Sequence, residues 1–272
     1  MIIGLGRLYL VVTFLVTSAA ILDADLILSI PRGLDRVALA APKPSIQKTI
    51  RMDGARFAAK RKLPISEAHY ALAKEITRSN NATERGIEVV LHLEQALKGH
   101  YETESCHQSL GQIYFAAGDL ERADRHFSKV AKLPPELELS WARSLLSLGR
   151  RDEAVERGKR AERALYELTH APTANSADEI HWLSALEFLE EFEVAVAFLE
   201  GRLAEDADES YAPKALSRLY TSWYDVLRRD LSVPTRAAVD KLLAALRHDP
   251  DNKASMERVI PLVRTLGSNK EH

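Results

Sequence analysis

The sequence contains little cysteine, glycine or proline. Cys106 is the only cysteine, so no disulfide can form within the chain and a zinc site built from several thiolates is excluded. With only 12 glycines and 11 prolines among 272 residues, helix-breaking residues are sparse, which suits a protein built mainly from helices and short turns. The formal net charge of −2 gives no overall attraction to nucleic acid, and we expect no nucleic-acid partner.

Motifs that bind cofactors or carry catalysis are also missing. The chain has no G-x-x-x-x-G-K-[ST] or G-x-G-x-x-G phosphate loop and no H-E-x-x-H zinc motif. His100, Cys106 and His107 are close in sequence, but no second pair of potential ligands follows at a metal-binding spacing. We therefore expect no enzymatic activity, no cofactor and no metal.

An apolar run occupies the N-terminus. Residues 8–22 form 15 uncharged residues, and extension back to Ile2 gives 21 residues interrupted only by Arg7. A helix of that extended length rises about 31 Å, close to the thickness of the hydrocarbon layer. Residues 1–30 are interpreted as a single-pass membrane anchor, because apolar residues resume at 26–30. A secretory signal peptide cut near Ser18, which would leave a secreted or periplasmic protein, and a buried helix are the alternatives.

A basic stretch follows at residues 31–64. Ala40–Pro44 is typical of a linker, and positive charges outnumber the two acidic residues, Asp35 and Asp53. The cations are Arg32, Arg36, Lys43, Lys48, Arg51, Arg56, Lys60, Arg61 and Lys62. Two interpretations are open: a solvated linker kept extended by its charges, or a segment that lies against acidic lipid headgroups. Which side of the membrane it occupies is also open.

The strongest pattern lies between His107 and Pro135. It comprises Leu110-Gly111, Tyr114, Gly118-Asp119, Ala123, Phe127 and Pro135. Small residues at 111 and 123 let two helices cross closely, large rings at 114 and 127 fill the space beside the crossing, and Pro135 is expected to stop the second helix. These spacings resemble a tetratricopeptide repeat (TPR), a pair of antiparallel helices. One such pair cannot bury its own apolar face, so neighbouring pairs are expected.

Other stretches repeat this pattern less closely. Val89 lies 34 residues before Ala123, and Ala142 and Ala154 match Gly111 and Ala123 in the next pair. The expected helix pairs span residues 66–97, 107–135, 137–165, 177–203 and 211–246, followed by a closing helix at 253–266. The resemblance implies an all-α fold over residues 65–270, a right-handed α-solenoid of antiparallel helix pairs. A helical bundle with the same apolar positions is the structural alternative.

The resemblance also implies a function. In similar proteins the first helices of successive pairs line a concave groove that binds an extended or helical peptide of a partner protein. The matching residues are Gln108, Gln112 and Phe115 in one pair, Leu139, Arg143 and Leu146 in the next, and Ile180, Ser184, Glu187 and Phe188 in the one after. Arg143 is the only cation among them, which argues against the acidic tails of heat-shock chaperones as partners.

The leading hypothesis is a membrane-associated TPR adaptor that binds another protein and has no catalysis of its own. A structural subunit of a cell-envelope assembly is one alternative. Another is an enzyme subunit with a site near the 169–176 loop, which contains His170 and Pro172. The partner, the pathway and the oligomeric state are left open by the sequence.

Overall fold

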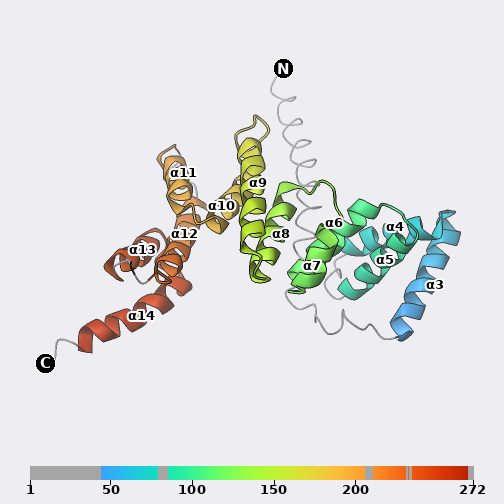
Figure 1. Ribbon diagram of the computed structural model, residues 1–272, viewed down its shortest axis with the longest axis horizontal. Coiled ribbons are helices and arrows are strands. Elements are labelled where there is room, and N and C mark those ends of the chain that lie inside the picture. The colour runs from blue at the N-terminus through green and yellow to red at the C-terminus, as the bar shows by residue number, and fades with distance from the viewer. Residues whose placement is uncertain (1–43, 79–84, 206–210, 231, 233–234, 269–272) are drawn as a thin grey trace, which may run out of the picture. The chain divides into compact units, whose positions relative to one another are not determined.

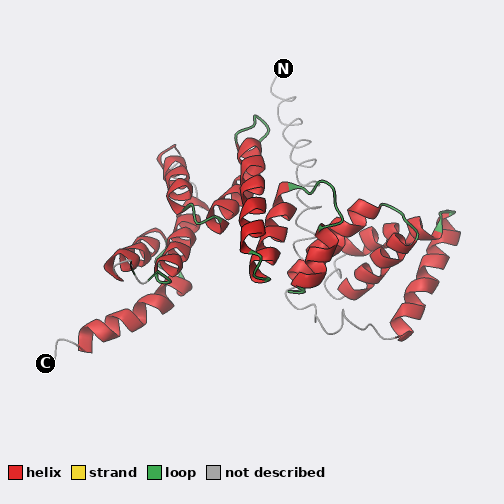
Figure 2. Ribbon diagram, in the orientation of Figure 1, coloured by secondary structure: helices red, strands yellow, loops and turns green. Residues whose placement is uncertain are grey.

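The computed structural model describes residues 44–78, 85–205, 211–230, 232 and 235–268. Helices connected by turns and loops account for these residues, with no strand among them (Figure 2). The chain divides into two compact units, residues 1–161 and 162–272, here called the N-terminal and C-terminal units. The expected all-α fold is confirmed.

The N-terminal unit contains six complete helices and the first part of a seventh within the described ranges (Figure 1). They are α3 (Pro44–Arg61), α4 (Ile65–Thr77), α5 (Gly86–Lys98), α6 (Thr103–Ala116), α7 (Leu120–Phe127), α8 (Pro135–Ser147) and α9 (Arg151–Thr169). Consecutive helices pack against one another from α3 to α8, and α6 also packs against α8. This order of contacts is compatible with a helical repeat.

The two N-terminal expectations have different outcomes. The apolar run at residues 1–30 lies outside the described residues, and no described helix is both long and apolar enough to cross a membrane. Within the expected 31–64 linker, residues 44–61 instead form α3, which packs against α4 and α5. Its buried face consists of Ile50, Gly54 and Ala58. Small residues allow this close packing although the helix has few large apolar side chains.

The crossing of α6 and α7 follows the spacing read from the sequence. Ala123 and Phe127 are fully buried, and Tyr114 is 1% exposed. Gly111 lies directly under the Phe127 ring, because a Cβ built on it would be 2.6 Å from Cδ1. The close approach of the helices therefore depends on the absence of a side chain at residue 111.

The expected role of Pro135 was wrong. Helix α7 already ends at Phe127, and Pro135 is the first residue of α8. Proline is favoured at the first position of a helix, where the missing N–H has no partner in any case and φ is already helical. Pro135 therefore begins the next helix pair and does not end the preceding one.

A polar contact recurs at the same place in three successive helix pairs. In each helix, the residue that repeat spacing places at the helix crossing is here called the crossing residue. The contact joins the side chain four residues before the crossing residue of the first helix to the side chain three residues after the crossing residue of the second helix. The contacts are His69 Nδ1 to His92 Nδ1 at 2.7 Å, His107 Nδ1 to His126 Nδ1 at 2.9 Å, and Arg157 Nη1 to Glu138 Oε1 at 2.9 Å. The matching crossing residues are Ala73 with Val89, Gly111 with Ala123, and Ala142 with Ala154. The three contacts thus occupy matching positions in the three helix pairs.

The C-terminal unit begins within α9 and continues through five further helices in the described ranges. They are α10 (Ser176–Phe188), α11 (Phe192–Glu205), α12 (Tyr211–Leu227), α13 (Thr235–His248) and α14 (Lys253–Ser268). Each packs against the next from α10 to α14. Tyr224, Ala238 and Leu242 form a core between α12 and α13, and Val259 and Leu262 of α14 cover it.

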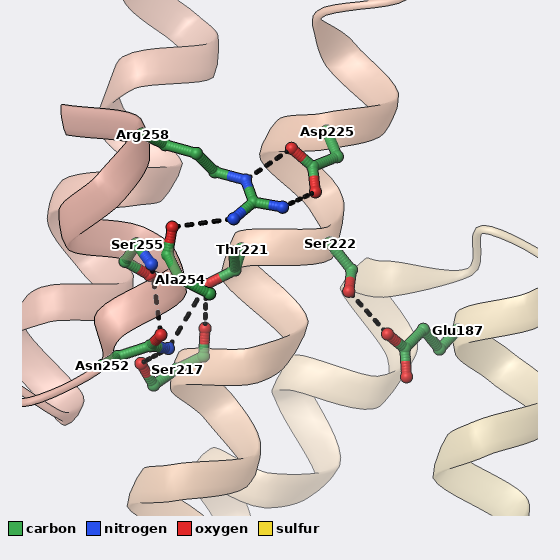
Figure 3. Close-up of polar contacts among 9 residues, drawn as sticks. All are labelled: Glu187, Ser217, Thr221, Ser222, Asp225, Asn252, Ala254, Ser255 and Arg258. Atoms are coloured by element: carbon green, nitrogen blue, oxygen red, sulfur yellow. Dashed lines mark hydrogen bonds and ion pairs between the residues drawn. The ribbon is translucent and has the colours of Figure 1, made fainter. Parts of the chain in front are cut away.

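Hydrogen bonds between side chains attach α14 to α12 (Figure 3). Asn252 caps α14, accepting from the Ser255 backbone N–H at 3.1 Å, and its Nδ2 donates to Ser217 Oγ at 2.8 Å. Thr221 Oγ1 lies 2.6 Å from Ser255 Oγ, with both side chains buried. Nearby, Arg258 donates two hydrogen bonds to Asp225. Asn252 is thus the residue that connects the cap of α14 to the buried hydroxyls of α12.

Replacing Asn252 by alanine is expected to loosen α14. The variant loses the cap and leaves Ser217 without the Nδ2 donor. Together these losses should lower the free energy that holds α14 in place by about 2–3 kcal/mol. Hydrogen exchange of the α14 amides should report the loss directly. Asn252→Ser, which can still cap the helix, should lose roughly half as much. Asp251→Ala, at an exposed neighbouring side chain, is the control, and equal loss in the control would contradict the assigned role of Asn252.

Candidate protein-binding surface

Six of the ten predicted binding residues lie on two helices that pack side by side. Helix α6 carries Gln108, Gln112 and Phe115, and α8 carries Leu139, Arg143 and Leu146. The structure therefore brings these two groups together on adjacent helices of the N-terminal unit.

Their exposure is uneven. Gln112 and Leu139 are buried, at 8% and 3% exposed, and contribute little to an open surface. Gln108, Phe115 and Arg143 are half-buried, whereas Leu146 is 41% exposed. Phe115 and Leu146 each lie four residues after the crossing residue of their helix, so they occupy equivalent places. The accessible part of this surface, here called the α6–α8 face, therefore comprises Gln108, Phe115, Arg143 and Leu146.

The remaining four predicted residues lie on α10 in the C-terminal unit. Ile180 is exposed, while Ser184, Glu187 and Phe188 are half-buried. Glu187 already has partners within the unit: Ser222 Oγ donates to its Oε1 at 2.6 Å (Figure 3), and Arg218 lies 3.5 Å from its Oε2. Glu187 therefore helps to attach α10 to α12, a role that the sequence did not indicate.

Helix α4 presents equivalent positions that are not among the ten predicted binding residues. Counting from Ala73 as the counterpart of Gly111, Tyr70 and Lys74 correspond to Gln108 and Gln112. Tyr70 packs against Tyr101, with ring centroids 5.6 Å apart, and Lys74 lies 5.7 Å from the Tyr70 ring. The sequence signal for this alignment was the histidine four residues before each crossing residue, His69 and His107.

The loop at residues 169–176 has contacts that stabilise the fold. Asn175 and Asp178 form a capping box at the start of α10. The His170 ring stacks on Tyr166, with centroids 4.0 Å apart, and its Nδ1 donates to the Tyr166 carbonyl at 2.8 Å. These contacts account for His170 and Asn175, whereas the buried Oγ1 of Thr169 has no hydrogen-bond partner among the described residues.

The groups considered for metal binding or reactivity are separated or buried. Cys106 is fully buried, and burial raises the pKa of its thiol to about 12, which keeps the thiol protonated at neutral pH. His107 pairs with His126 and not with Cys106. Over the described ranges, no three side chains of His, Cys, Asp or Glu are grouped so that they could hold a metal ion.

Comparison with known proteins finds no family model that matches this chain and no curated protein with significant sequence similarity.

Proposed function

We propose that this protein is a non-catalytic adaptor of the TPR type that binds a segment of a partner protein on the α6–α8 face. The observation that carries the proposal is the placement of Phe115 and Leu146 at equivalent positions of two adjacent helices. Side chains in such a row can contact successive apolar residues of one bound segment.

The chemistry of the face favours a partner segment that is partly apolar. Phe115 and Leu146 offer apolar contact, Gln108 offers an amide, and Arg143 is the only cation. An amphipathic helix or an extended segment with alternate apolar residues would match this mixture. A segment with several carboxylates would find only one guanidinium, so acidic chaperone tails are not expected to bind.

Membrane association through residues 1–30 is part of the proposal. Its support is the apolar run with a single interruption at Arg7. Deletion of residues 1–30 should release the protein from the membrane fraction of cells. Retention of the truncated chain in that fraction would refute the anchor without affecting the proposed binding face.

The binding face is tested by capturing partners from detergent-solubilised membranes and identifying them by mass spectrometry. The double variant Phe115→Ser, Leu146→Ser should reduce the recovery of a specific partner at least tenfold, because central apolar contacts dominate binding energy. Leu243→Ser is the matched control, because Leu243 is also 41% exposed but lies on α13. Equal recovery by the double variant and the wild type would contradict the proposal.

A further inference from the structure

A cavity of about 290 Å³ lies in the N-terminal unit between α3, α4 and α5. Asp53, Arg56, Phe57 and Lys60 line it from one face of α3, since they are spaced by three, four and seven residues. Leu72 of α4, His92 of α5 and Arg85 at the start of α5 form the rest of its lining. This volume is just below the range of about 300–1,000 Å³ usual for small-molecule sites.

The lining carries more positive than negative charge. Three cations, Arg56, Lys60 and Arg85, face a single carboxylate, Asp53. Arg56 contacts Asp53 only loosely, at 3.8 Å, and its side chain is 73% exposed. Arg85 directs Nε and Nη2 to Glu88, which leaves Nη1 as a further possible donor. The cavity is therefore suited to an anion with several oxygens.

The inner wall of the cavity is neutral or apolar. His92 is 1% exposed, and Nδ1 is engaged with His69, so only the opposite edge of the ring can meet a ligand. Burial and the neighbouring imidazole lower the pKa of His92 to about 4, which keeps it neutral at pH 7. Phe57 and Leu72 are half-buried and offer apolar contact beside the cations. A ligand that fills the cavity would thus combine an anionic group with an apolar one.

From this arrangement we infer that the α3–α4–α5 cavity binds a phosphate group attached to a small apolar moiety. Arginine and lysine side chains together can donate to three phosphate oxygens, and guanidinium groups match the geometry of phosphate. The phosphate can belong to an anionic lipid headgroup or to a soluble phosphate monoester, since both present the same chemistry. The site is independent of the α6–α8 face and of the proposed anchor.

Phenyl phosphate is the probe, titrated calorimetrically into the full chain in dodecyl maltoside. It should bind the wild type, and the double variant Arg56→Gln, Lys60→Gln should bind it at least tenfold more weakly, because two charged donors are lost. The matched control is Lys48→Gln, Arg51→Gln, which removes the same two residue types from exposed positions of α3 outside the cavity. This control should bind as the wild type does.

Three results would overturn the inference. No binding by the wild type would do so, and so would equal weakening in the two double variants, which would indicate diffuse attraction to α3. Equal affinity for benzoate would contradict the preference for phosphate. The source is then distinguished by competition: displacement of phenyl phosphate by phosphatidic acid in the micelles, and not by phosphatidylcholine, supports a lipid headgroup. Resistance to both lipids supports a soluble phosphate monoester.

Discussion

Replacement of Gly111 by alanine is expected to destabilise the N-terminal unit by about 2–3 kcal/mol, although alanine normally favours a helix. The added Cβ would lie 2.6 Å from Cδ1 and 2.7 Å from Cε1 of Phe127. Phe127 is fully buried and cannot rotate away without disturbing its neighbours. Urea unfolding, followed by hydrogen exchange of the α6 and α7 amides, measures the change in the free energy of unfolding.

The chain offers a matched control for this substitution. Gly201 also lies within a helix, α11, but a Cβ built there would meet no atom within 4 Å. Gly201→Ala should therefore stabilise the protein by up to about 1 kcal/mol. The double variant Gly111→Ala, Phe127→Leu should lose less free energy of unfolding than the two single variants lose together. The reason is that the smaller leucine side chain leaves space for the methyl group of alanine. Strict additivity would show that the two residues do not share this contact.

Acidification is expected to destabilise the N-terminal unit through its two histidine pairs. In each pair one Nδ1 must donate to the other, so protonation of both rings at Nδ1 would place two N–H groups face to face. Burial, and then the partner imidazole, lower the pKa of both His92 and His126 to about 4. Arg85 near His92, and Arg125 and Arg122 near His126, act in the same direction.

The pH window follows from these values. Between about pH 6.5 and pH 4 the unfolded chain binds more protons than the folded one, so stability is complete above this window and falls as the pH falls through it. The loss for His92 is about 3 kcal/mol, and that for His126 is smaller because its ring is more exposed to solvent. About 2 kcal/mol of the His92 loss falls between pH 7.5 and pH 5, and urea unfolding at these two pH values measures it.

Variants identify the rings responsible. The pair of changes His69→Leu, His92→Leu should remove a large part of the pH dependence, since no buried imidazole remains at that crossing. His100→Asn is the control, because His100 is exposed and asparagine tolerates its φ of 55°. A wild-type stability that is unchanged between pH 7.5 and pH 5 would contradict the neutral, buried state of these pairs.

Several features of the fold were predictable because they depend on neighbours in sequence. The helix pair around Gly111 and Ala123 follows from small and large residues at helical spacing, and its packing is confirmed. Helix α3 was not predicted, because Ile50 is the only large apolar residue that it buries. Its packing depends instead on Gly54, on which the His69 ring of α4 lies, a contact that local sequence does not reveal. The membrane anchor, the handedness of the proposed solenoid and the partner stay predictions.

The helices that carry the candidate residues were predictable, but the exposure of these residues was not. Repeat spacing predicts equivalent positions for Phe115 and Leu146. Packing against the neighbouring helices, however, determines that Gln112 is buried and Leu146 is exposed. Similarly, the histidines of the two pairs are 23 and 19 residues apart, and the different connections between their helices hide the shared geometry.

By itself, the sequence determined the helical class and the approximate positions of most helix pairs, because both depend on periodic apolar residues and on small residues at the crossings. Tertiary structure alone decided which polar side chains meet across helices: the imidazole pairs, the attachment of α14 through Asn252, and the cation-lined cavity beside α3. The reason is physical. Periodicity fixes the face of a helix on which a residue lies, whereas contact between residues depends on how two helices cross and how the intervening chain connects them.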